Sequence, residues 1–149
     1  MGQSLRFGID AIPLRHRNAL GVKGIKLRFM DELQDVTPIE DDHLLTITER
    51  GYGKRTEFDE FRGHGRATMG VRNIQTDVSG GVVSSKAVSD EVDIILMSRS
   101  GIVIRTKVSE ISVQKRGTRG VRIMKLDEGD SVVGFTILDA DDEVSEIDE

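Results

Sequence analysis

The chain has 149 residues and a mass of 16.5 kDa, a length that fits one compact domain or a short array of repeats. The absence of cysteine excludes disulfides, cysteine-based zinc sites and thiol nucleophiles. No apolar run reaches the ~18 residues that span a bilayer, and the N-terminal residues lack a signal-peptide core, so we expect a cytoplasmic protein without membrane contact. Sixteen glycines against two prolines favour tight turns and many short strands.

The net charge of −5 is unevenly distributed along the chain. No lysine or arginine follows Lys125, whereas ten of the 26 acidic residues lie in 127–149. The body of the chain is therefore mildly basic and its end is strongly acidic. We predict a disordered acidic tail over residues 139–149, which either aids solubility or imitates phosphate charge and competes with DNA for the basic body.

A pattern of glycine, arginine and apolar residues recurs with a spacing of 49 and then 50 residues, which predicts three copies of one structural unit. We assign residues 1–40 to an incomplete first blade, 41–89 to a second blade and 90–138 to a third. Nothing before Gly2 matches the first strand of the later copies. We therefore expect a first hairpin without its outer partner, and open apolar faces at the ends of the array.

The second copy predicts four strands in chain order. Residues 43–48 and 52–57 form a hairpin that turns at Gly51, and 71–76 and 82–88 follow. The third copy repeats these strands at 94–98, 102–106, 121–126 and 132–138. In the first copy, the strand-like segment 21–27 matches the third strand of the later copies. The predicted core residues lie on this segment and on its two counterparts: Val22, Ile25, Val71, Ile74, Val121 and Met124. Four short strands in about 50 residues predict an all-β fold of propeller-like blades, four strands each, in an incomplete ring.

Basic residues recur at matched positions of the copies. The three matched sets are Arg6, Arg55 and Arg105, then Arg17, Arg66 and Arg116, then Lys23, Arg72 and Arg122. Equivalent positions of a radial array lie at equivalent heights, so these side chains predict a curved positive stripe that binds a bent polyanion. Five further bases have no matched acid and favour the same interpretation: Arg15, Lys54, Arg62, Lys115 and Arg119.

The alternative interpretation of the matched arginines is structural. Each of them would pair with a nearby acid, such as Glu57, Glu60 or Glu110, and join adjacent blades. If the stripe does bind nucleic acid, duplex DNA is the expected ligand, because aromatic residues that could stack on single-stranded bases make up only 4% of the chain.

The sequence predicts no enzyme, no metal and no cofactor. Tyr52 could act as a nucleophile, but the matched residues are Gln3 and Ile102, and no activating base accompanies it. The glycines around Gly51 are not followed by the helix of a nucleotide-binding loop. The three histidines lack the spacing of metal ligands.

The segments HLLTITERGYGKRTEFDEFR, GRATMGVRNI, IILMSRSGIVIRTKVSEISV and RGTRGVRIMKL resemble the C-terminal domain of DNA gyrase A. The resemblance runs from Gly2 to about Leu138 and includes the acidic end. It implies a β-pinwheel whose blades exchange strands, and a basic rim that wraps duplex DNA so that this type IIA topoisomerase introduces negative supercoils. It also implies a non-catalytic chain whose partners are DNA, the remainder of gyrase A and the ATPase component, gyrase B.

One segment resembles the basic wrapping box of that family, Q-[RK]-R-G-G-[RK]-G, except that Thr118 replaces a glycine. The box-like motif comprises Gln114, Lys115, Arg116, Gly117, Thr118, Arg119 and Gly120. The family's box belongs to the first blade, whereas this motif lies in the last copy, and 15–21 and 64–70 are weaker versions of it. Two alternatives stay open: the similar C-terminal domain of topoisomerase IV, and a propeller-type scaffold for protein interactions, which would expose an apolar or aromatic patch.

Overall fold

The computed structural model describes residues 1–138, which form nine strands and three short 3-10 helices. The strands are β1 Gln3–Ser4, β2 His43–Thr48, β3 Tyr52–Glu57, β4 Val71–Arg72, β5 Val82–Val88, β6 Asp93–Ser98, β7 Val103–Lys107, β8 Val121–Arg122 and β9 Val132–Leu138. The helices are η1 Ile9–Ala11, η2 Phe58–Glu60 and η3 Val108–Glu110. Within these residues no helix is long and apolar enough to cross a membrane. The predicted tail lies outside the described residues.

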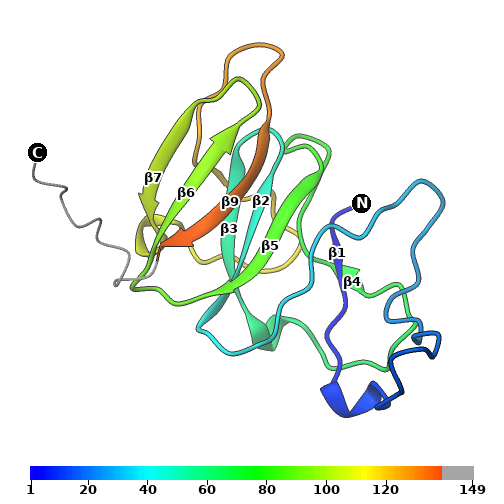
Figure 1. Ribbon diagram of the computed structural model, residues 1–149. Coiled ribbons are helices and arrows are strands. Elements are labelled where there is room, and N and C mark those ends of the chain that lie inside the picture. Colours follow the sequence, from blue (N-terminus) through cyan, green and yellow to red (C-terminus); the bar gives the residue numbers. More distant parts are fainter. Residues whose placement is uncertain (139–149) are drawn as a thin grey trace, which may run out of the picture.

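The strands form three antiparallel groups, in the orders β5-β2-β3-β8, β7-β6-β9 and β1-β4 (Figure 1). Three strands of the first group come from the second copy, and β8 comes from the third. β1 of the first copy pairs with β4 of the second copy in the same way, with Gln3 opposite Arg72 where the later pair has Tyr52 opposite Arg122. Strands therefore cross at both junctions between copies, and the all-β pinwheel fold is confirmed.

The two long hairpins form where the sequence predicts them. In the first, the amide of Tyr52 donates to the hydroxyl of Thr48 over 3.3 Å, and Gly51 closes the turn with a φ of +79°. Glycine adopts this left-handed conformation without the steric cost that a Cβ atom brings. Ser98 and Gly101 repeat the arrangement in the third copy, where Gly101 has a φ of +90°.

The third strand of each copy is shorter than predicted. The ranges 71–76 and 121–126 were expected to be extended, but β4 and β8 contain two residues each. The amides of Asn73 and Ile74 both donate to the carbonyl of Gly2, and those of Ile123 and Met124 both donate to Gly51. Successive amides of an extended strand point to opposite sides, so two of them on one carbonyl end the strand.

The core lies between the second and third copies, whose sheets stand beside each other in Figure 1. Its buried members include Leu45, Ile47, Ile94, Leu96, Val108, Ile111, Met124, Val132 and Phe135. Of the predicted core residues, Ile74 and Met124 are buried, Val22, Ile25 and Val71 are half-buried, and Val121 is 40% exposed. The buried pair follows the point where each third strand ends and turns inward.

Residues 12–40 of the first copy form no strand or helix. In the later copies the segment equivalent to 21–27 pairs with β1 or β3, which are equivalent strands of the preceding copy. No hairpin precedes the first copy within the described residues, so residues 21–27 have no such edge to pair with. Several large apolar side chains of this region are exposed, among them Leu14, Leu20, Phe29, Met30 and Val36.

Candidate nucleic-acid interface

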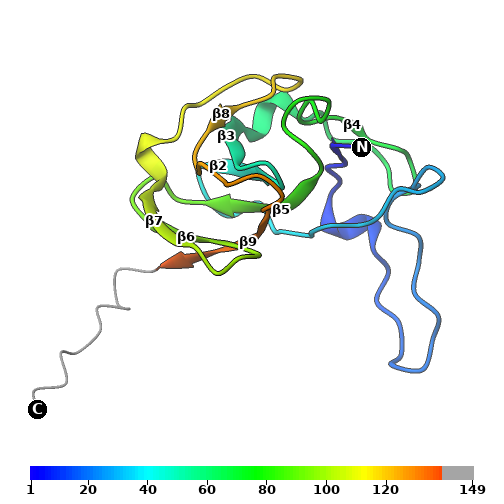
Figure 2. The ribbon, with the colours of Figure 1, turned by 90° about the horizontal axis from the view of Figure 1, so that it is seen from above.

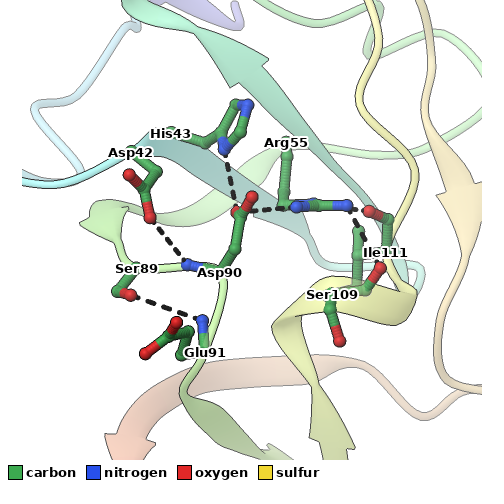
Figure 3. Close-up of polar contacts among 8 residues, drawn as sticks. All are labelled: Asp42, His43, Arg55, Ser89, Asp90, Glu91, Ser109 and Ile111. Atoms are coloured by element: carbon green, nitrogen blue, oxygen red, sulfur yellow. Dashed lines mark hydrogen bonds and ion pairs between the residues drawn. The ribbon is translucent and has the colours of Figure 1, made fainter.

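Arg55 joins the second copy to the third (Figure 3). Its Nε donates to the carbonyl of Ile111 over 2.6 Å, and one terminal nitrogen donates to the carbonyl of Ser109 over 3.1 Å. The other terminal nitrogen lies 2.6 Å from a carboxylate oxygen of Asp90. All three nitrogens of the guanidinium group therefore make contacts across the boundary between the second and third copies, which we call the second junction. Arg55 is only 8% exposed.

Arg6 makes similar contacts with backbone carbonyls at the first junction, between the first and second copies. A terminal nitrogen of Arg6 donates to the carbonyl of Phe58 over 2.9 Å and to that of Phe61 over 3.4 Å. Phe61 is the counterpart of Ile111, so the same joint occurs twice. The partners of Arg6 are backbone carbonyls of the next copy. The structural interpretation of the matched arginines predicts acidic side chains as partners instead.

Asp90 is a member of the second junction that has no obvious signal in the sequence. One of its carboxylate oxygens contacts both Arg55 and the Nδ1 of His43, the latter over 2.8 Å (Figure 3). Burial raises the pKa of Asp90, but hydrogen bonds from Arg55 and then from His43 outweigh that effect and hold the pKa below its usual value. Asp90 thus stays ionised and fixes the guanidinium group of Arg55.

Arg105 is the third member of the same set, and its surroundings differ. Its side chain is 68% exposed, and its Nε donates to Asp93 within the same sheet over 2.6 Å. Within the described residues no further copy is docked against β7. The contrast with Arg55 indicates that this position is buried only where another copy covers it.

The second matched set also makes contacts between copies. Arg66 donates to the carbonyls of Ala11 over 2.7 Å and Lys23 over 2.9 Å, and Arg116 donates to the carbonyl of Arg72 over 3.1 Å. Lys23 and Arg72 are counterparts, so Arg66 and Arg116 occupy equivalent places. Each contact brings two basic residues of neighbouring copies together, with Lys23 beside Arg66 and Arg72 beside Arg116. Arg66 is half-buried, and the other three are exposed.

The third matched set is exposed at all three positions. The guanidinium of Arg122 lies 5.4 Å from the centre of the Tyr52 ring and donates to its hydroxyl over 3.2 Å. This stacking holds Arg122 at the surface and gives Tyr52 a role as its support.

Lys54 departs most from its predicted place, because it is completely buried. Its ammonium donates to the carbonyl of Asn73 over 2.7 Å, to the carbonyl of Lys115 over 2.8 Å and to the hydroxyl of Thr118 over 3.2 Å. Like Arg55, Lys54 belongs to the second junction. Both side chains are buried there, so neither can contact DNA directly. Burial lowers the pKa of Lys54 to about 8 despite the opposing charge of Glu60, so the ammonium form prevails at neutral pH.

The box-like motif forms a loop that leaves its bases at the surface. Lys115, Arg116 and Arg119 are exposed, whereas the amide of Gly117 donates to Asn73 over 3.1 Å. Gly117 has a φ of +75°, but Thr118 has no positive φ. Thr118, which departs from the wrapping-box pattern that this motif resembles, therefore lies where the backbone does not need glycine.

The remaining glycine of the motif lies against the preceding hairpin. A Cβ atom on Gly120 would stand 2.6 Å from the carbonyl oxygen of Gly53, closer than such contacts permit. Gln114 sits at the other end of the loop, where its amide donates to the carbonyl of Arg55 over 2.8 Å. Both ends of the box-like loop are thus fixed to the second copy.

Most of the predicted DNA-binding residues keep their side chains in solvent. The exposed members are Arg15, Arg17, Lys23, Arg62, Arg72, Arg105, Lys115, Arg116, Arg119 and Arg122, while Arg6 and Arg66 are half-buried. The structure thus encloses Lys54 and Arg55 in the second junction and leaves most of the other predicted bases at the surface.

The DNA gyrase C-terminal domain, beta-propeller family matches residues 2–40, 42–89 and 93–139. The chain belongs to this family. The part of gyrase A that it resembles is therefore the C-terminal domain and not the catalytic core. The three matched segments lie close to the ranges assigned to the three copies from the sequence, 1–40, 41–89 and 90–138.

Individual relatives and solved structures agree with the family match. The chain is 41% identical over 136 residues to DNA gyrase A of Salmonella typhimurium, a match that covers 90% of this chain and 16% of that protein. It is 37% identical to DNA gyrase A of Haloquadratum walsbyi, covering 99% and 18%. The chain thus spans under a fifth of the length of these relatives.

Among solved structures, the C-terminal domain of DNA gyrase A superposes with a TM-score of 0.84 at 29% identity, covering 91% of this chain and 47% of that one. The C-terminal domain of DNA topoisomerase IV superposes with a TM-score of 0.79 at 21% identity, covering 94% and 45%. The second match shows a shared fold.

Proposed function

We propose that this chain binds and wraps duplex DNA as part of a DNA gyrase, a type IIA topoisomerase. The bases that hold the DNA lie in the loops around residues 15–17, 62–66 and 115–119. The observation that carries the proposal is the repeated gathering of basic residues at successive junctions, where Arg66 bonds the backbone of Lys23 and Arg116 bonds that of Arg72. Equivalent clusters on successive copies suit a regular, curved polyanion.

The position of these loops supports the same proposal. The segments after η1, η2 and η3 lie on the periphery of the molecule, outside the strands (Figure 2). Their guanidinium groups present planar forks that match phosphate oxygens. Aromatic platforms for single-stranded bases are scarce, since Tyr52 already supports Arg122, so a duplex is the preferred ligand.

The proposed wrapping requires bent DNA. Bending 20–30 base pairs by 40–90° costs on the order of 1–6 kcal/mol, which several phosphate contacts must offset. In the complete enzyme, the bent segment would be presented to the cleavage core so that strand passage introduces negative supercoils.

The protein partners in this proposal are the remainder of gyrase A and, through it, the ATPase component gyrase B, in the cytoplasm. The exposed Leu14, Leu20 and Phe29 of the first copy support a protein contact at that end. They flank the segment 21–27, whose counterparts each pair with a strand of the preceding copy. They therefore favour contact with the rest of gyrase A over the alternative of an independent interaction scaffold.

Salt dependence and one arginine test the proposed DNA contacts. The logarithm of the DNA affinity should fall linearly with the logarithm of the salt concentration, with a slope of about −0.9 per phosphate contact. Arg119→Ala should make that slope shallower by about 1 and weaken all duplex sequences alike, because phosphates carry no sequence information. Fluorescence anisotropy with labelled duplexes measures both quantities.

The matched control is Arg99→Ala, which removes an exposed arginine from a hairpin turn outside the three loops. It should leave the affinity within about twofold of the wild type. An affinity that does not respond to salt, or a loss confined to one sequence, would refute phosphate binding by these loops.

A further inference from the structure

The box-like loop is anchored on a charged side chain that never reaches the surface. Lys54 lies on β3 of the second copy, and all three of its nitrogen–hydrogen bonds have acceptors within 3.2 Å. Two of these acceptors, the Lys115 carbonyl and the Thr118 hydroxyl, belong to the loop. The third acceptor, the carbonyl of Asn73, also accepts a hydrogen bond from the backbone amide of Gly117. Lys54 and the loop are therefore bound to the same carbonyl.

The network extends through the loop itself. The hydroxyl of Thr118 donates to the carbonyl of Lys115 over 3.1 Å, while its own carbonyl accepts from the amide of Gln75 over 3.0 Å. A buried ammonium that loses its acceptors carries a large desolvation cost. The ammonium of Lys54 therefore favours the conformation of residues 115–118 that keeps the Lys115 carbonyl and the Thr118 hydroxyl within 3.2 Å of it.

The first junction allows a comparison within the same chain. It lacks the three hydrogen bonds of Lys54, which we call the lysine clamp. The counterpart of Lys54 there is Leu5, which cannot donate a hydrogen bond, although the backbone bonds Ala67 to Gly24 and Lys26 to Thr68 repeat those of the second junction. The loop at the first junction carries Gly65 and Met69 in place of Lys115 and Arg119. The lysine clamp therefore occurs beside the loop that holds the additional bases.

We propose that Lys54 is a positioning residue for DNA binding, whose buried ammonium holds residues 115–118 in the conformation that presents Lys115 and Arg119 to duplex DNA. This inference rests on the proposed function. Lys54 itself touches no phosphate, because it has no exposed surface. Its influence on DNA is transmitted through the loop.

A double-mutant cycle tests the inference. Lys54→Met keeps a long unbranched side chain and removes the donors. It should weaken duplex binding on the order of tenfold and make the salt slope shallower by up to about 2, the loss expected for two phosphate contacts. In a background that already carries Lys115→Ala and Arg119→Ala, Lys54→Met should cause less than about a twofold further loss.

Amide hydrogen exchange separates a local effect from general destabilisation. Lys54→Met should speed exchange at Gly117 and Gln75, whose amides donate within the network, and leave Leu45 and Ile47 of β2 protected. Thr118→Val, which removes one acceptor without altering charge, should weaken DNA binding two- to threefold and keeps the test available if Lys54→Met fails to fold. Lys107→Met removes an exposed charge on β7 and should change the affinity less than twofold.

The outcomes distinguish the two proposals. If the Lys115→Ala and Arg119→Ala variant binds DNA as the wild type does, both the loop's role in the proposed function and the positioning role of Lys54 are wrong. If that variant loses affinity but Lys54→Met and Thr118→Val do not, only the positioning role is wrong. Equal losses from Lys54→Met in both backgrounds would also overturn it, since a structural defect would act regardless of the loop's bases.

Discussion

Replacing Arg55 with alanine should lower the free energy of unfolding by about 3 kcal/mol. The substitution removes the donor from the carbonyls of Ile111 and Ser109 and leaves Asp90 without its guanidinium partner. Because these groups belong to two copies, their loss should weaken the second junction. Urea denaturation followed by circular dichroism measures the difference.

Arg105→Ala is the matched control, since Arg105 occupies the same place in the third copy. Its side chain is largely exposed and bonds only Asp93 among the described residues, so its removal should cost under about 1 kcal/mol. Similar losses in the two variants would show that contacts across the junction do not account for the burial of Arg55.

Gly51→Ala should also destabilise the protein strongly, by roughly 3 kcal/mol. The φ of +79° alone costs an alanine about 1–2 kcal/mol. In addition, the new Cβ atom would overlap the carbonyl oxygen of Met124, which lies just beyond β8 in the third copy. Relief of that overlap requires β8 to move away from β3. Urea denaturation should therefore show a further loss in the free energy of unfolding beyond the conformational cost.

Gly101→Ala separates the two causes. Gly101 occupies the same turn position with a φ of +90°, but nothing lies within 4 Å of an added Cβ atom. Its substitution should therefore cost only the conformational part, about 1–2 kcal/mol. Equal effects at the two glycines would mean that the close approach of Met124 contributes nothing to the sensitivity of Gly51.

The local pattern of the sequence was sufficient to predict the hairpins. Their strands are bounded by Gly51 and Gly101, whose turns depend on neighbouring residues, and β2, β3, β5 and β9 have the predicted ranges. The third strands were predicted too long because their ends depend on two carbonyls of another copy, Gly2 and Gly51. Such long-range acceptors leave no periodicity in the strand that they terminate.

The matched arginines show how far repetition alone can assign a role. Spacing identified Arg6 and Arg55 as equivalent, but equivalence is expected both for a ligand-binding stripe and for a joint between copies. Arg6 and Arg55 both donate to backbone carbonyls of the next copy, so both residues join copies. Every residue has a backbone carbonyl, so the sequence does not indicate which carbonyls will accept these bonds. Lys54 lies next to Arg55 in a polar stretch, so the sequence predicts a base at the surface. Two of its three acceptors are backbone carbonyls, which the sequence does not reveal.

Change in DNA linking number tests the central proposal most directly. Nicked plasmid would be incubated with increasing amounts of the chain, sealed by ligase and freed of protein, and its topoisomers separated on a gel. Chiral wrapping predicts a shift in the mean linking number that grows with protein concentration and shrinks for the Lys115→Ala and Arg119→Ala variant. An unchanged topoisomer distribution on plasmid saturated with protein would contradict wrapping.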